Sequence, residues 1–336
     1  MGALAPAASA HGGTEQVVRP GESIQKAVDK ARPGSTIVLK RGTYRGSVTI
    51  TKKLTLRGAG QETVIVPGKD GEAQSECAKA GNGICVTGTD GHPVTGVRIR
   101  SLTVAGFAKT GIWARNTDRL EVHRVTARDN GQWGIAQDRS TRASFRRNTA
   151  SGNGDAGLYV ANVFEADAES KTRDTRNMVI SDNRLTGNRI GMTVRRLRNL
   201  TVERNTVTEN CAGIFVVLPR TAGDLTVRRN AVYENNNRCP ATNRLPHLQG
   251  IGIVLVGAGK VQVEQNMIRD NAGDSPYSGG IVVFRSMDGV SNEENTIRDN
   301  LVLGNSPADL ATRDSQGKDN RFVNNICRTS EPAGAC

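Results

Sequence analysis

The chain has 336 residues, of which 38 are glycine and only 4% are aromatic, and its formal net charge is +12. No stretch approaches the ~20 consecutive apolar residues that a membrane-spanning helix needs, so no membrane span is predicted. The basic excess favours an anionic partner. The scarcity of aromatic rings argues against single-stranded nucleic acid, which binds largely by stacking on such rings. The alternative reading of the charge is a solvated basic surface without a partner.

The first residues differ in composition from the rest of the chain. Residues 1–10 are rich in small side chains and end in Ala-Ser-Ala, which is typical of the last part of a secretory signal before cleavage. A disordered alanine-rich tail is the alternative. We therefore expect residues 1–15 to be a signal remnant or tail, residues 16–336 to be a single domain, and the protein to be extracellular.

A short helix is predicted next. Ile24, Ala27, Val28 and Ala31 fall on one helical face between Ser23 and Arg32, and Pro33-Gly34 ends the pattern. Three strand-like runs come after it, at 36–39, 47–50 and 53–57. Because a stack of strands exposes apolar core at its ends, we expect the helix to cap the N-terminal end.

The rest of the chain repeats a short unit. Its signature is an asparagine, one residue, an aliphatic residue, two residues and a second asparagine, usually followed by a Gly-aliphatic pair. The first asparagine column is Asn148, Asn183, Asn205, Asn230, Asn266, Asn300 and Asn325. The second is Asn130, Asn153, Asn188, Asn210, Asn235, Asn271 and Asn305. The shortest steps within the first column are 22 and 25 residues, and the longer steps contain insertions.

This unit predicts an all-β right-handed parallel β-helix of about ten coils. Two short strands meeting at an asparagine corner, then a glycine turn and a third strand, close one triangular coil, and coils stack ~4.8 Å apart. Asparagine suits such a corner because it tolerates left-handed dihedral angles and can hydrogen-bond the identical residue one coil away. A leucine-rich solenoid is excluded because its leucine spacing is absent.

Six cysteines occur in three near pairs, which favours local disulfides and export. The pairs are Cys77 with Cys85, Cys211 with Cys239, and Cys327 with Cys336. Other pairings stay open. No CxxC occurs and there are only four histidines, so a metal site built from these residues is not expected. The tail between Cys327 and Cys336 is expected to close the C-terminal end.

The opening of the domain resembles a known superfamily. The segments Val18-Arg-Pro-Gly-Glu-Ser-Ile-Gln-Lys-Ala-Val28, Gly42-Thr-Tyr44 and Leu54-Thr-Leu-Arg-Gly-Ala-Gly60, with the later repeats, resemble the pectate-lyase-like superfamily. The likeness is to its NosD-like and polysaccharide-lyase-like members and covers nearly the whole chain after about residue 16. It implies the fold but not the function, because these motifs are structural. The polysaccharide-active members generally bind substrate on the third-strand face.

That face is unusual in this chain. Alternation points one column outward, at Trp113, Ala136, Tyr159, Thr193, Phe215, Val254 and Val282. An exposed apolar and aromatic stripe of this kind needs an explanation. Insertions at 161–176, 236–249, 272–278 and 285–294 leave the ends of the third strands. They either form the walls of a binding groove or fold over the stripe and shield it.

Around this face lie residues suited to an anionic sugar. A lyase acting on a uronic acid must neutralise the carboxylate, remove the neighbouring proton and protonate the leaving oxygen. We expect His247 as the base, with Arg195, Arg220 and Arg285 as the other catalytic residues. The expected substrate contacts are Trp113, Asp138, Tyr159, Phe215 and Tyr277. Taken singly, each of these residues is more commonly an ordinary surface residue.

The sequence therefore indicates an extracellular, monomeric protein that acts on an acidic polysaccharide or an anionic cell-wall polymer, by lyase-type β-elimination. A non-catalytic binding scaffold is the alternative. The alginate-epimerase Asp-Pro-His-Asp motif and the polygalacturonase motifs are absent. No cofactor is expected, although Ca²⁺ is possible through Glu165, Asp167 and Glu169.

Overall fold

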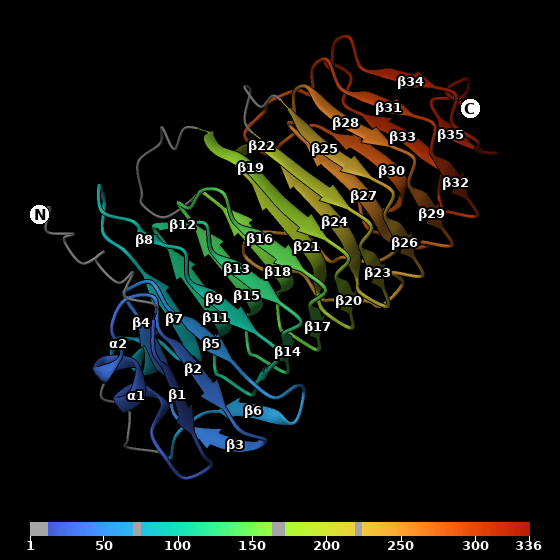
Figure 1. Cartoon of the computed structure of the whole chain (residues 1–336). Coiled ribbons are helices and arrows are strands. Elements are labelled where there is room, and N and C mark those ends of the chain that lie inside the picture. Colours follow the sequence, from blue (N-terminus) through green and yellow to red (C-terminus); the bar gives the residue numbers. More distant parts are fainter. Residues whose placement is uncertain (1–12, 70–74, 163–171, 219–223) are drawn as a thin grey trace, which may run out of the picture.

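The computed structural model describes residues 13–69, 75–162, 172–218 and 224–336, and there the chain winds into a parallel β-helix (Figure 1). Successive turns add one strand to each of three parallel sheets, here named sheet A, sheet B and sheet C. The predicted fold class is confirmed.

Sheet A consists of β1 (Glu15–Val18), β2 (Thr36–Leu39), β5 (Thr55–Arg57), β9 (Arg98–Arg100), β13 (Glu121–His123), β16 (Ser144–Arg146), β19 (Arg173–Ser181), β22 (Leu197–Glu203), β25 (Leu225–Arg228), β28 (Val261–Glu264), β31 (Thr296–Arg298) and β34 (Arg321–Val323). Sheet B consists of β3 (Gly42–Arg45), β6 (Thr63–Val66), β10 (Thr103–Ala105), β14 (Thr126–Arg128), β17 (Thr149–Ser151), β20 (Arg184–Thr186), β23 (Thr206–Thr208), β26 (Ala231–Tyr233), β29 (Met267–Arg269) and β32 (Leu301–Leu303). Sheet C consists of β4 (Val48–Ile50), β7 (Ile84–Thr87), β11 (Thr110–Arg115), β15 (Trp133–Asp138), β18 (Ala156–Ala161), β21 (Ile190–Arg195), β24 (Ala212–Val217), β27 (Ile251–Val256), β30 (Gly279–Phe284), β33 (Leu310–Arg313) and β35 (Ser330–Glu331).

The core fills the interior of the helix. Alternation sends the middle residue of each three-residue strand inward, so Ile99, Val122 and Phe145 in successive strands of sheet A have no exposed surface. The same pattern on all three sheets buries one continuous aliphatic column. Each coil therefore contributes to a core that only its neighbours complete.

Two asparagine ladders run along the interior corners, as the sequence predicted. In each ladder the side-chain amide donates to the Oδ1 atom of the asparagine one coil further on, for example from Asn205 to Asn230 at 2.9 Å. The same Oδ1 atom also accepts the backbone N–H of the preceding ladder residue, as Asn230 does from Asn205 at 3.0 Å. The ladders thereby satisfy backbone groups that the bends in the chain leave without a sheet partner.

The expected reason for asparagine at the corners was partly wrong. No ladder asparagine has a positive φ; the residue before it does, and in the first column this residue is often charged, as at Arg147, Arg204 and Asp299. The left-handed residue turns the chain and points its long side chain to solvent. The asparagine after it supplies the inward hydrogen bonds. Corner geometry and corner hydrogen bonding thus belong to two neighbouring residues.

The glycine of the Gly-aliphatic pair is not a turn residue either. It is the second residue of the sheet C strands, as Gly252 is in β27. A Cβ atom at Gly252 would lie 2.2 Å from the carbonyl oxygen of Gly280 in the next coil. The coils stack too closely here for any side chain, which explains the recurrence of glycine.

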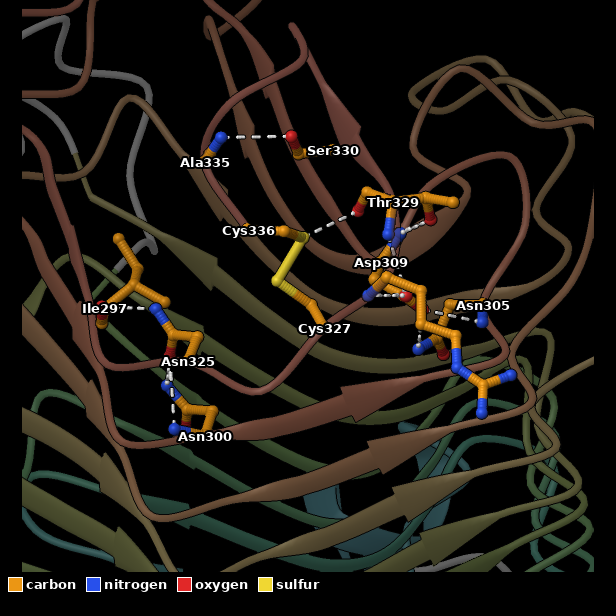
Figure 2. Close-up of a disulfide and its surroundings, with 11 residues drawn as sticks. Ile297, Asn300, Asn305, Asp309, Asn325, Cys327, Thr329, Ser330, Ala335 and Cys336 are labelled. Carbon is orange, nitrogen blue, oxygen red and sulfur yellow. Dashed lines mark hydrogen bonds between the residues drawn. A yellow bond between two sulfur atoms is a disulfide. The ribbon is translucent and has the colours of Figure 1, made fainter.

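Both ends carry the predicted caps. The helix α1 (Ile24–Lys30) lies at the β1 end of the solenoid and buries Ile24, Ala27 and Val28 in the main core (Figure 1). At the other end the Cys327–Cys336 disulfide fastens the tail (Figure 2). There the second asparagine ladder ends on Asp309, whose Oδ1 atom accepts the side-chain amide of Asn305 at 3.1 Å. A carboxylate suits this position because the last ladder residue has only to accept.

The three disulfides join the near pairs favoured by the sequence: Cys77–Cys85, Cys211–Cys239 and Cys327–Cys336. Two further small elements lie outside the main sheets. A second helix, α2 (Glu76–Lys79), contains Cys77, and β8 (Val94–Thr95) pairs with β12 (Thr117–Asp118). Within the described residues no helix is long and apolar enough to cross a membrane.

Candidate functional site

The outer face of sheet C carries the aromatic stripe that the repeat predicted. Register places Trp113, Ala136, Tyr159, Thr193, Phe215, Val254 and Val282 in one ladder across seven strands. The neighbouring outward ladder contains Arg115, Asp138, Arg195 and Arg313. Both outward columns were therefore predicted correctly.

Aromatic rings stack along this face. The rings of Trp113 and Trp133 lie 5.8 Å apart, and those of Trp133 and Tyr159 lie 4.5 Å apart, in both cases nearly parallel. Further along, Tyr277 makes edge contacts with Phe215 and Phe284. Such contacts add about 0.5–1.5 kcal/mol per pair beyond area burial. The stripe is thus partly a second hydrophobic core, outside the solenoid.

Segment 236–249 covers part of the stripe. It is fixed to sheet C by the Cys211–Cys239 disulfide and closed on itself by paired backbone hydrogen bonds between Cys239 and Leu248. Leu248 is fully buried against this face, and Phe215 is only 2% exposed. Shielding, one of the two readings left open by the sequence, therefore holds for the middle of the stripe.

A pocket of about 490 Å³ remains open on the same face. Tyr159, Thr193, Arg195 and Phe215 from the outward columns line it. Its walls come from the ends of the strands, from segment 236–249 and from segment 285–294. The walling reading therefore holds beside the shielded region, and the loops form a pocket on an apolar and aromatic base.

Three arginines surround this pocket: Arg189, Arg195 and Arg244. Arg189 donates to the carbonyl oxygens of Pro240 and Pro246, at 2.7 and 3.4 Å, and so ties segment 236–249 to the end of β21. Arg244 lies 3.8 Å from the carboxylate of Asp155, which also accepts the indole N–H of Trp133 at 3.1 Å. The positive charge is thus held by rigid neighbours.

Tyr159 and Arg195 are the most closely coupled polar groups in the pocket. Burial raises the pKa of Tyr159 above its ordinary value of 10.0, while the positive charge of Arg195 and its hydrogen bond to the phenol oppose that rise. The phenol is therefore protonated at neutral pH and lies beside a cation. A pair of this kind can bind a carboxylate and donate a proton to an oxygen.

The pocket unites four of the predicted site residues: Tyr159, Arg195, Phe215 and Tyr277. Trp113 lies at the end of the aromatic stack, beside the pocket but not in its lining. Arg220, and the possible calcium ligands Glu165, Asp167 and Glu169, fall outside the described residues. In the described part of the chain no group of three or more histidine, cysteine, aspartate or glutamate side chains could hold a metal ion.

The structure places the remaining three predicted site residues elsewhere. Asp138 is fully buried within 4 Å of the guanidinium groups of Arg115 and Arg139, so its geometry does not suit a substrate contact. His247 does not line the pocket; its Nε2 atom lies 3.0 Å from a carboxylate oxygen of Asp274. Arg285 is also absent from the lining and donates to the carbonyl oxygen of Gly289.

Sequence reasoning missed Arg189, although a signal was present. Glycine follows the second asparagine in two coils, at Gly131 and Gly154, whereas Asn188 is followed by Arg189. A long cation at a position used for close packing elsewhere marks a local demand. Arg244 carried no such signal, because its placement depends on how segment 236–249 folds.

Comparison with known proteins agrees with this architecture. The family model described as right handed beta helix region matches residues 43–232, more than half of the chain. The chain belongs to the right-handed β-helix family. No curated protein matches it in sequence.

Several solved structures resemble this β-helix protein. The A-module of the mannuronan C-5 epimerase AlgE4 from Azotobacter vinelandii is 20% identical with a TM-score of 0.61, over 92% of this chain and 93% of that one. The periplasmic alginate epimerase AlgG is 13% identical with a TM-score of 0.61, over 93% and 84%. An alginate lyase from Paenibacillus sp. str. FPU-7 is 15% identical with a TM-score of 0.58, over 95% and 99%. At these identities the likeness establishes the shared fold.

Proposed function

We propose that this β-helix protein is an extracellular protein that acts on an acidic polysaccharide in the pocket on sheet C. The observation that carries the proposal is the set of three arginines around a pocket with an apolar and aromatic base. Sugar rings have apolar faces that pack on such a base, and each uronate carboxylate can accept hydrogen bonds from a guanidinium. The three solved structures named above act on alginate by their titles, which supports this class of substrate.

The reaction that fits best is β-elimination. Arg195, with Arg189 or Arg244, pairs with the carboxylate of a uronate and makes the adjacent C–H bond more acidic. A base takes that proton, the C4–O bond breaks as the C4–C5 double bond forms, and Tyr159 donates its phenolic proton to the leaving oxygen. The raised pKa of Tyr159 suits this donor role.

The base is proposed to be Asp288. This carboxylate lines the pocket, is exposed, and has no cation within 4.0 Å among the described residues. His247, the base expected from the sequence, is engaged by Asp274 outside the pocket. The catalytic assignment therefore moves from the tip of one loop to another.

The test is the appearance of unsaturated uronate products, followed by ultraviolet absorbance, from polymannuronate, polyguluronate, pectate and glycosaminoglycans with and without Ca²⁺. We expect one substrate to give a signal, and Arg195→Gln to lower kcat/KM about 100-fold. Arg228→Gln is the matched control, because it removes one arginine from sheet A, far from the pocket lining. A signal unaffected by Arg195→Gln would contradict the assignment.

A non-catalytic binding scaffold is the second candidate. It is favoured by the position of His247 outside the pocket and by the loops that shield much of the aromatic stripe. It predicts that polymer binding is lost in Arg195→Gln although no substrate gives unsaturated products. The absorbance screen combined with a binding measurement separates the two candidates.

A further inference from the structure

The outer face of sheet A has a charge pattern that changes along the solenoid. In the C-terminal half, Glu203, Arg228, Glu264 and Arg298 occupy the same position in the successive strands β22, β25, β28 and β31. Arg228 pairs with Glu203 at 2.8 Å, and Arg298 pairs with Glu264. Alternating charges one coil apart neutralise each other, so this half of the ladder is internally balanced.

The N-terminal half of the same ladder has no acidic member. Register continues it through Arg57, Arg100, His123 and Arg146 in β5, β9, β13 and β16. The left-handed residues immediately after two of these strands are Arg124 and Arg147. Like charges in neighbouring coils, ~4.8 Å apart, repel each other, so this arrangement lowers stability unless an anion lies across it.

A groove adjoins the basic ladder. It has a volume of about 670 Å³, lies at the start of the same strands, and is lined by Lys53, Arg98, Arg119, Arg142 and His92 among others. Glu121 in its lining pairs with Arg98 at 3.2 Å, and Arg142 pairs with Asp118 at 2.6 Å. We call the groove and the Arg57–Arg146 ladder together the basic face.

Several cations of the basic face are not neutralised. In the described part of the chain, no carboxylate lies within 4.0 Å of Lys53, Arg119, Arg124, Arg146 or Arg147. Arg124, Arg146 and Arg147 are exposed. The local field is felt by His123, whose pKa is lowered by burial and then by the charges of Arg124, Arg147 and Arg100, with Glu121 opposing. The geometry leaves a continuous strip of positive charge facing solvent.

We propose that the basic face is a second binding surface for a linear acidic polysaccharide, separate from the pocket on sheet C. Repeating coils place cations at regular spacing along one direction, which suits a polymer with a carboxylate on each sugar. The outward positions of β5, β9, β13 and β16 carry no aromatic ring on which bases could stack, so nucleic acid is the poorer fit.

This surface would hold the polymer while another part of the same chain reaches the pocket. The two surfaces lie on different sheets of the solenoid, so a long chain can engage both and a short oligosaccharide only one. Linking two weak sites in this way raises the apparent affinity for long polymers. The inference rests on the proposed function only for the class of polymer.

The test compares two double variants by affinity electrophoresis through gels containing a long polyuronate at low ionic strength. Arg124→Gln/Arg146→Gln removes two unneutralised cations from the basic face. Arg228→Gln/Arg298→Gln removes two cations from the balanced half of the same sheet, so the net charge falls equally in both. We expect the first to weaken retardation about tenfold and the second to stay within about twofold of wild type. Circular dichroism verifies that both are folded.

Several outcomes would overturn the proposal. Equal losses in both variants would show that only net charge matters, and no loss in either would show that the basic face is not used. Single-stranded DNA retarded as strongly as the polyuronate, with the same loss in Arg124→Gln/Arg146→Gln, would assign the surface to nucleic acid. Failure of the proposed function is distinguishable: no uronate product forms from any substrate, yet the variant-specific loss of retardation persists.

Discussion

Removing one interior ladder residue should cost a large share of the stability of the protein. Asn205 is 1% exposed, and its side chain takes part in four hydrogen bonds. It accepts from the backbone and side-chain nitrogens of Asn183, at 3.0 and 2.8 Å, and donates to Ile180 and Asn230, at 3.0 and 2.9 Å. Asn205→Ala leaves these buried partners unsatisfied. At about 1 kcal/mol per bond, the free energy of unfolding should fall by about 4 kcal/mol.

The matched control lies at the end of the same ladder. Asn325 has three side-chain hydrogen bonds, two accepted from Asn300 and one donated to Ile297, but it is only half-buried in the last coil (Figure 2). Water can replace these bonds, so Asn325→Ala should cost about 1 kcal/mol. Equilibrium urea unfolding followed by far-ultraviolet circular dichroism measures both. Equal costs in the two variants, or a loss below about 1 kcal/mol in Asn205→Ala, would refute the reasoning.

Three further outcomes are expected. Replacing both cysteines of the Cys211–Cys239 pair by serine should leave the solenoid folded but make segment 236–249 susceptible to limited proteolysis and weaken oligosaccharide binding about tenfold, as read by calorimetry. Although burial raises it, hydrogen bonds from Arg228 and Arg204 hold the pKa of Glu203 below 4.5, so its stabilising effect exists above that pH and is lost as the pH falls. Urea midpoints of wild type and Glu203→Gln should therefore differ at pH 7 and converge in acid; a gap that is constant with pH would argue against this ion pair. Because the pKa of Tyr159 is raised, kcat/KM should show no loss from phenol ionisation below about pH 10, whereas an alkaline limb near pH 8 would contradict the donor role.

The fold could be predicted because its determinants are local and repeated. The asparagine columns, the Gly-aliphatic pairs and the strand alternation each recur once per coil, so the phase of every strand on sheet C followed from sequence. The two corrections concern causes within a coil. The left-handed residue precedes the asparagine, and glycine at positions such as Gly252 reflects close stacking. Neither distinction changes the spacing by which the repeat is recognised.

The site could be predicted only where it lies on the repeat. Tyr159, Arg195 and Phe215 are strand residues, and counting along the coil placed them on one face. His247, Arg285 and Arg244 belong to insertions, whose folds depend on contacts such as the Arg189 bond to Pro240 and the Cys211–Cys239 disulfide. Asp138 was placed on the correct face, but its burial with Arg115 and Arg139 depends on neighbouring coils. Loop geometry of this kind has no periodic signal.

The central claim is that the pocket on sheet C receives a uronate, and the position of a bound oligosaccharide tests it most directly. A crystal structure of the protein with a uronate oligosaccharide of the preferred polymer should show a sugar between Tyr159 and Arg195, with its carboxylate on the Arg195 guanidinium. An oligosaccharide bound at saturating concentration elsewhere on the solenoid, with solvent alone between these two residues, would contradict the account.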